Sequence, residues 1–181
     1  MASTEEHGIL PLPDLTPAPK LLIVAAPFYR AIADKQIAGA KATLVQAGAS
    51  CDLIEVPGAL EIPTAIRLAE RHYEGFVALG CVIRGETTHY ETVCNDSSRA
   101  ISLLGLEGLC IGNGILTCEN MDQAVVRAEP NAMDKGGGAA AAALHLIALK
   151  RRFQRPGRPD RLPDGDDDII LANAAGLTRT A

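Results

Sequence analysis

The segment from Arg84 to His89, with the letters RGETTH, combines residue types that could bind an anion and move a proton. Gly85 permits a close approach of a ligand to the backbone. Thr87 and Thr88 precede a helical pattern, and the free N–H groups of a helix start attract anions. These features predict a phosphate-binding loop. The other interpretation, in which one of the threonines only caps the helix, is equally compatible with the letters.

His89 lies in the first turn of that helical pattern. An imidazole is the side chain best suited to proton transfer near neutral pH, which makes His89 the candidate acid–base residue. The other three histidines, at positions 7, 72 and 145, do not follow a predicted strand end. A lone histidine is often structural, and the sequence identifies no Asp or Glu partner for this one.

Two further segments follow predicted strands and could hold a flat, polar ligand. Phe28 follows Pro27 directly after an apolar run, so its ring could stack on a heterocycle or close the core beneath the loop. The segment from Pro57 to Pro63 has a proline at each end, which restricts its backbone and could present its amides in a fixed array. It could also be a simple helix entry, with Glu61 placed favourably in the first turn.

Asn113 and Arg127 are associated with the last predicted strand and its helix. The segment Asn113 to Thr117 is expected at the end of that strand. Arg127 ends the following helical pattern, where a cation stabilises the helix dipole or reaches a bound phosphate.

The elements that position these residues alternate along the chain. Four short apolar runs predict buried parallel strands: residues 21–26, 51–56, 76–83 and 109–116. Helical patterns follow each of them, with Ala33, Ile37, Ala40 and Leu44 on one face of the first and an Ala-rich helix at about residues 138–152. This order predicts an α/β fold, a three-layer αβα sandwich of the flavodoxin-like type with a four-stranded parallel sheet. Ligands of such sheets bind outside the carboxyl ends of the strands.

Composition limits the class of protein. The 181 residues fit one domain, and the net charge of −5 argues against a nucleic-acid partner. The five cysteines form no CxxC or Cys/His cluster, so we expect free thiols, no metal site and a cytoplasmic location. No apolar stretch predicts a membrane span. Proline-rich residues 1–19 are expected to form a mobile arm, residues 20–153 the domain, and residues 154–181 a disordered tail.

The ordered motifs resemble those of one family. Phe28, PGALEIP, GCVIRGETTH, GNGILT followed by ENMDQAVVRA, and DKGG before an Ala-rich helix occur in the order found in lumazine synthases. The resemblance covers about residues 21–153. It implies riboflavin biosynthesis: the condensation of 5-amino-6-(D-ribitylamino)uracil with 3,4-dihydroxy-2-butanone 4-phosphate to 6,7-dimethyl-8-ribityllumazine, phosphate and water, without a cofactor.

The resemblance also implies a role for each site residue. Phe28 would stack on the pyrimidine, and Ala59, Leu60 and Glu61 would hold the ribityl chain. Cys81, Val82 and Ile83 would contact the pyrimidine edge through their backbone. Glu86 and Thr87 would bind the phosphate, Arg127 would supply its counter-charge, and His89 would transfer protons. Asn113 would stand at the far wall of the pocket.

The chain departs from the family pattern at three places. Asn113 replaces a Phe of many members, which makes that wall more polar, and Leu60 replaces a Phe. Glu129 and Pro130 replace small residues in a turn of the shell-forming members. The resemblance implies a homo-oligomer with active sites between subunits, and this bulkier turn favours an isolated pentamer over a 60-subunit shell.

Two other functions are compatible with such a pocket. A non-catalytic scaffold of the same fold could bind flavin or lumazine, but it would need neither His89 nor Arg127. A general flavodoxin-like mononucleotide binder is the second alternative, and the ordered motifs disfavour it.

Overall fold

A computed structural model describes residues 10–154 of the chain. Their sheet consists of four parallel strands in the order β2-β1-β3-β4, formed by β1 (Lys20–Ala25), β2 (Ser50–Glu55), β3 (Gly75–Ile83) and β4 (Ile111–Cys118). The predicted strands agree with these bounds to within two residues. The predicted four-stranded parallel sheet is therefore confirmed.

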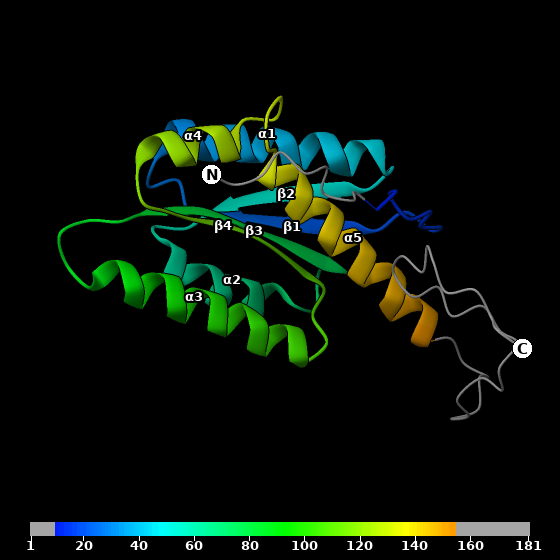
Figure 1. The fold of residues 1–181 in the computed structure, drawn as a ribbon. Coiled ribbons are helices and arrows are strands. Elements are labelled where there is room, and N and C mark those ends of the chain that lie inside the picture. Colours follow the sequence, from blue (N-terminus) through cyan, green and yellow to red (C-terminus); the bar gives the residue numbers. More distant parts are fainter. Residues whose placement is uncertain (1–9, 155–181) are drawn as a thin grey trace, which may run out of the picture.

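Helices cover both faces of the sheet (Figure 1). One face carries α1 (Arg30–Gln46), α4 (Met121–Ala128) and α5 (Lys135–Phe153), and the other carries α2 (Ile62–Ala69) and α3 (His89–Leu106). A short 3-10 helix, η1 (Ala59–Glu61), precedes α2. The three-layer αβα arrangement of the flavodoxin-like type is thus confirmed.

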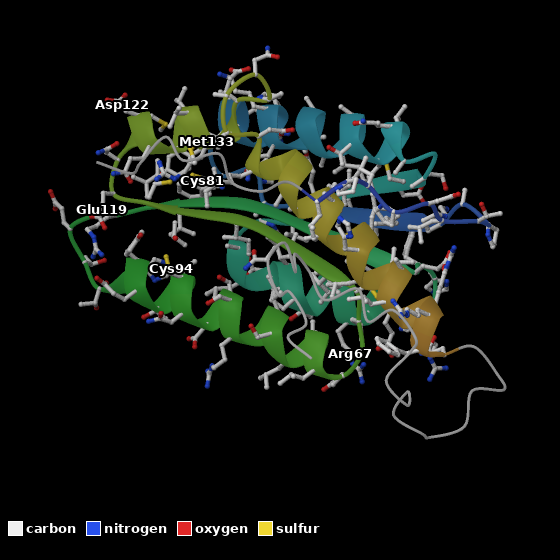
Figure 2. The ribbon with its side chains drawn as sticks, turned by 45° about the vertical axis from the view of Figure 1, so that its right-hand side comes forward. Arg67, Cys81, Cys94, Glu119, Asp122 and Met133 are labelled. Atoms are coloured by element: carbon white, nitrogen blue, oxygen red, sulfur yellow. The ribbon has the colours of Figure 1, made fainter. Side chains whose placement is uncertain are left out.

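The core divides into layers on the two faces of the sheet. Alternate residues of β1 point to opposite faces, so Leu21 and Ile23 pack with α1 and α5, whereas Leu22 and Val24 pack with α2 and α3. Cys81 lies on the face that α4 covers, and Cys94 lies on α3 under the opposite face (Figure 2). The predicted face of α1, which includes Ile37, Ala40 and Leu44, is buried.

Helix α5 approaches the sheet very closely, which accounts for its small residues. A Cβ atom on Gly112 of β4 would stand 1.8 Å from the backbone oxygen of Ala139. The helix begins three residues earlier than expected, because the Asp134 carboxylate accepts a hydrogen bond from the Gly137 amide (3.0 Å) and caps it.

Strand β2 differs from its prediction. We expected a buried strand, but its residues are exposed or half-buried, with Ile54 39% exposed. Because β2 lies at the edge of the sheet and, among the described strands, pairs with β1 alone, its apolar residues are covered incompletely.

Residues 10–19 lie beside α5. Leu15 is buried in the core, and the Pro17 carbonyl accepts a hydrogen bond from Arg151 (2.6 Å). The rest of the expected arm and tail, residues 1–9 and 155–181, lies outside the described residues. Between residues 10 and 154, no helix has both the length and the apolar character needed to cross a bilayer.

Candidate active site

A cavity of about 500 Å³ lies at the carboxyl ends of the strands, where parallel sheets bind ligands. Segments after β1, β2 and β3 supply its walls. The predicted site residues that line it are Phe28, Ala59, Leu60, Glu61, Cys81, Val82, Ile83, Thr87 and His89. The fold therefore brings together residues from three segments that are far apart in the sequence.

The end of strand β3 lines the cavity, and one edge of this end is unpaired. Its pairing with β1 ends at the register pair Ala25–Leu79, but its pairing with β4 continues to Ile83–Cys118. The Leu79 carbonyl accepts the Ala26 amide (2.8 Å) on the β1 side. Backbone direction alternates along a strand, so Cys81 and Ile83 direct their N–H and C=O groups to that same, open side. A flat ligand with donors and acceptors on its edge could pair with them.

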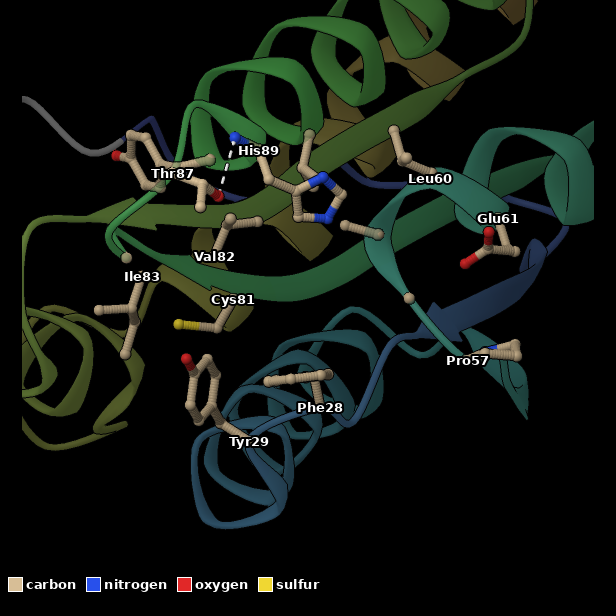
Figure 3. Close-up of a pocket in the computed structure, with 15 residues that line it drawn as sticks. Phe28, Tyr29, Pro57, Leu60, Glu61, Cys81, Val82, Ile83, Thr87 and His89 are labelled. Carbon is tan, nitrogen blue, oxygen red and sulfur yellow. Dashed lines mark hydrogen bonds between the residues drawn. The ribbon is translucent and has the colours of Figure 1, made fainter.

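Two aromatic rings stand on one side of the end of β3, and His89 and Leu60 stand on the other (Figure 3). Phe28 is 75% exposed, and its ring contacts Tyr29 edge to face, with centroids 5.1 Å apart and planes at 76°. A ring so exposed contributes little to the core. Its place at the cavity favours ligand stacking over the alternative of a core residue.

The loop after β2 forms another wall. Ala59 is buried, Leu60 is 39% exposed and Glu61 is exposed at the rim. The Glu61 amide donates to the Gly58 carbonyl (3.2 Å), which closes a single 3-10 turn, and Pro63 is then the second residue of α2. The segment is a helix entry that also presents polar groups to the cavity.

The segment from Gly85 to His89 closes the cavity from the side of α3. Thr88 holds the N-cap position, but its hydroxyl makes no capping hydrogen bond. The His89 amide has a long contact of 3.4 Å with the Thr87 hydroxyl. A capping hydrogen bond from the Thr88 hydroxyl therefore does not explain this residue.

His89 is the first residue of α3, and its side chain is exposed in the cavity. Within residues 10–154, no carboxylate forms an ion pair with its imidazole. The ring is thus accessible for proton exchange with a ligand or with water.

Three predicted site residues do not line this cavity. Glu86 lies in the loop beside Thr87, and Arg127 lies on α4, where its Nη1 donates to the Gln123 carbonyl (3.1 Å). Asn113 was expected at a strand end, but it lies within β4 opposite Ala78. Its Oδ1 accepts a hydrogen bond from the Ile115 amide (3.0 Å). Asn113 lies inside the strand rather than at its end because β4 continues to Cys118.

Other lining residues escaped the sequence analysis. Tyr29, Tyr90 and Val93 contribute side chains to the cavity. Val93 stands four residues after His89 and hence on the same face of α3, which is a signal that the sequence contained. Tyr29 follows Phe28 directly, but adjacency alone does not distinguish a second wall residue.

The charges around the cavity are unevenly distributed. No lysine or arginine of the described residues lines it. Arg84, which follows β3, forms ion pairs with Glu119 (Nε–Oε2 2.7 Å) and Glu91. These hydrogen bonds raise the pKa of the Arg84 guanidinium. An anionic ligand therefore needs a cation from elsewhere.

The thiol in the cavity is not an activated nucleophile. Burial, and to a lesser extent the neighbouring Cys118, raises the pKa of Cys81 to about 12. The thiol thus remains protonated at neutral pH. Within residues 10–154 there is also no group of three His, Cys, Asp or Glu side chains arranged to hold a metal ion. The described cavity is equipped for positioning and proton transfer.

Comparison with known proteins decides the family. Residues 18–151 match the family described as 6,7-dimethyl-8-ribityllumazine synthase. The chain belongs to the lumazine synthase family. It is 53% identical over 149 residues to the 6,7-dimethyl-8-ribityllumazine synthase of Jannaschia sp. (strain CCS1). The matched segment is 81% of this chain and 84% of that protein.

Other relatives agree with this lumazine synthase assignment. The protein of the same description from Novosphingobium aromaticivorans is 56% identical over 136 residues, or 74% of this chain and 98% of that protein. The one from Bartonella tribocorum is 57% identical over 139 residues, which is 75% of this chain and 92% of that protein. The cavity lies within the matched range, so the resemblance read from the motifs is confirmed.

Proposed function

We propose that this chain condenses 5-amino-6-(D-ribitylamino)uracil with 3,4-dihydroxy-2-butanone 4-phosphate to 6,7-dimethyl-8-ribityllumazine in riboflavin biosynthesis. The observation that carries the proposal is the cavity at the end of β3, where an exposed aromatic ring and an unpaired strand edge face an accessible histidine. Membership of the lumazine synthase family identifies the ligand that these features fit.

The uracil ring binds between Phe28 and the open edge of β3. Stacking uses the face of the heterocycle, and the amides and carbonyls of Cys81 and Ile83 pair with its edge. The ribityl chain extends along Ala59 to Glu61, whose backbone and carboxylate offer partners for hydroxyl groups. This placement leaves the nucleophilic amine of the substrate facing the segment from Gly85 to His89.

The reaction then needs protons moved at several steps. The substrate amine attacks the ketone, and loss of water gives an imine; elimination then releases inorganic phosphate, and ring closure releases water. The nucleophile belongs to the substrate, so the protein supplies positioning and an acid–base group. His89 is that group, next to the loop in which Glu86 and Thr87 bind the phosphate.

The counter-charge for the phosphate comes from a second copy of the chain. The cavity of one chain lacks a lysine or arginine, and the nearby Arg84 is already paired with two carboxylates. Arg127 forms no ion pair within residues 10–154 and can neutralise a phosphate at a neighbouring subunit. Asn113, exposed on the edge strand β4, would form the far wall of the same shared pocket.

These shared sites require a closed oligomer, for which we propose a pentamer in the cytoplasm. The free cysteines fit a reducing compartment. We place the isolated pentamer ahead of a 60-subunit shell, because Glu129 and Pro130 make the turn before α5 bulky. Repulsion between like charges of neighbouring pentamers is a second conceivable obstacle, but Lys35 pairs with Glu129 (2.7 Å) and offsets its charge. We therefore base the proposal on the bulk of the turn.

The decisive experiment mixes purified protein with both substrates and follows the absorbance and fluorescence of the lumazine. Catalysed formation, at a rate proportional to protein concentration, supports the proposal. Tight binding of lumazine without its formation would show instead a non-catalytic scaffold. Loss of activity in His89→Ala with retained lumazine binding would separate catalysis from binding.

A further inference from the structure

Arg84, beside the cavity, makes contacts through both its backbone and its side chain. Its backbone N–H extends the β3–β4 ladder by donating to the Cys118 carbonyl (2.9 Å). Its guanidinium donates to Glu119, which directly follows β4, and to Glu91 in the first turn of α3. The same group lies over the Tyr90 ring, 4.3 Å from its centroid. One side chain thus joins two strand ends and a helix start.

These contacts tie together the two ends of the segment Gly85–Thr88. Arg84 directly precedes the segment, and Glu91 follows it within one helical turn. The segment itself has few contacts: a Cβ atom on Gly85 would meet nothing within 4 Å, and within residues 10–154 the Thr87 hydroxyl has a single contact, of 3.4 Å, with the His89 amide. Without the tie, a segment with so few contacts would sample many conformations.

The network continues toward α4 (Glu119 is labelled in Figure 2). The Glu119 amide donates to the Gln123 side chain (3.0 Å), and the Gln123 carbonyl accepts a hydrogen bond from Arg127 (3.1 Å). Glu119 and Gln123 therefore connect Arg84 to Arg127, the cation proposed for the phosphate site of a neighbouring subunit.

We propose that Arg84 is a positioning residue, which holds the phosphate-binding segment and the start of α3 through Glu91 and Glu119 without binding the phosphate itself. This inference rests on the proposed function. Two carboxylates already occupy the guanidinium, and the hydrogen bond from Arg84 is the main reason that the pKa of Glu91 is lowered. The group of three therefore carries an excess negative charge and offers a phosphate no net attraction.

The test compares Arg84→Met, Glu91→Gln and Glu119→Gln with a matched control. Arg99→Met removes another exposed arginine, one on α3 that forms an ion pair with Asp96 (2.9 Å). For each variant, the KM of each substrate, kcat and the inhibition constant of inorganic phosphate are measured in the lumazine-formation assay.

We expect Arg84→Met to raise the KM of the butanone phosphate and the inhibition constant of inorganic phosphate about tenfold, with the KM of the uracil substrate within about twofold of wild type. Glu91→Gln should shift the same two constants in the same direction by a smaller factor. The control should leave all constants unchanged.

Glu91→Gln also separates positioning from direct binding. If Arg84 were itself the phosphate ligand, removal of its competing carboxylate would free it and tighten phosphate binding. That result would overturn the proposal, as would an equal rise of both KM values in Arg84→Met. If Arg84→Met does not fold, the direction of the shift in Glu91→Gln decides. A wild-type protein that forms no lumazine would refute the proposed function instead.

Discussion

Replacement of Phe28 by alanine tests the stacking wall of the cavity. The side chain is 75% exposed, so its truncation removes little buried surface, and we expect the free energy of unfolding to change by no more than about 1 kcal/mol. The loss should appear in ligand binding. Stacking of a base on an aromatic side chain contributes about 1–3 kcal/mol, which corresponds to about a 5- to 150-fold weaker affinity.

The assay is a titration of the protein with 6,7-dimethyl-8-ribityllumazine, followed by fluorescence anisotropy. The chain contains no tryptophan, so the emission of the ligand is observed against a low protein background. Phe28→Tyr keeps a ring and should bind within about threefold of wild type. Phe153→Ala is the matched control, because this phenylalanine is 76% exposed at the end of α5, outside the cavity.

Two results for Phe28→Ala would contradict this expectation. If Phe28→Ala binds the lumazine as tightly as wild type, the ring does not stack on the ligand and the predicted role is wrong. If it unfolds, the contact with Tyr29 has a structural importance that the exposure of the ring does not suggest.

Four other outcomes are expected. His89→Ala should lower kcat by about 10²-fold with nearly unchanged lumazine affinity, and wild-type turnover at neutral pH would remove the residue from the mechanism. Arg127→Ala should raise the KM of the phosphorylated substrate and leave that of the uracil, whereas equal losses would indicate a structural role. Gly112→Ala should destabilise the fold by about 1–3 kcal/mol in denaturant unfolding, because its Cβ would stand 1.8 Å from the Ala139 oxygen, whereas Gly105→Ala, with nothing within 4 Å, should be neutral or stabilising. Light scattering should give a mass near five chains, and a mass near sixty would show that the turn before α5 does not prevent shell assembly.

Much of the architecture could be predicted from local patterns. The buried face of α1 is visible in the sequence because Ile37, Ala40 and Leu44 recur at helical spacing. The parallel sheet follows from the alternation of strands and helices. The residues at three strand ends, such as Phe28 and His89, could be assigned to one cavity because parallel strands end at the same edge of a sheet.

Neighbours in space were harder to predict. The apolar sequence of β2 resembles that of a central strand, and only the topology of the sheet shows that this strand lies at the edge. Asn113 was misplaced because the pairing of β4 with β3, rather than any letter, sets where β4 ends. In both cases the deciding quantity is which strand lies alongside, which hydrophobic periodicity does not contain.

The sequence by itself determined the fold class, the family and the residue types of the chemistry, because these depend on motifs and on the spacing of residues within one element. Only the tertiary structure decided that the edge of β3 beyond Leu79 is open and that Arg84 is held by Glu91 and Glu119. The two carboxylates that hold Arg84 stand 7 and 35 positions after it in the sequence. Their partners are chosen by strand register and helix packing, and a single sequence does not list those distances.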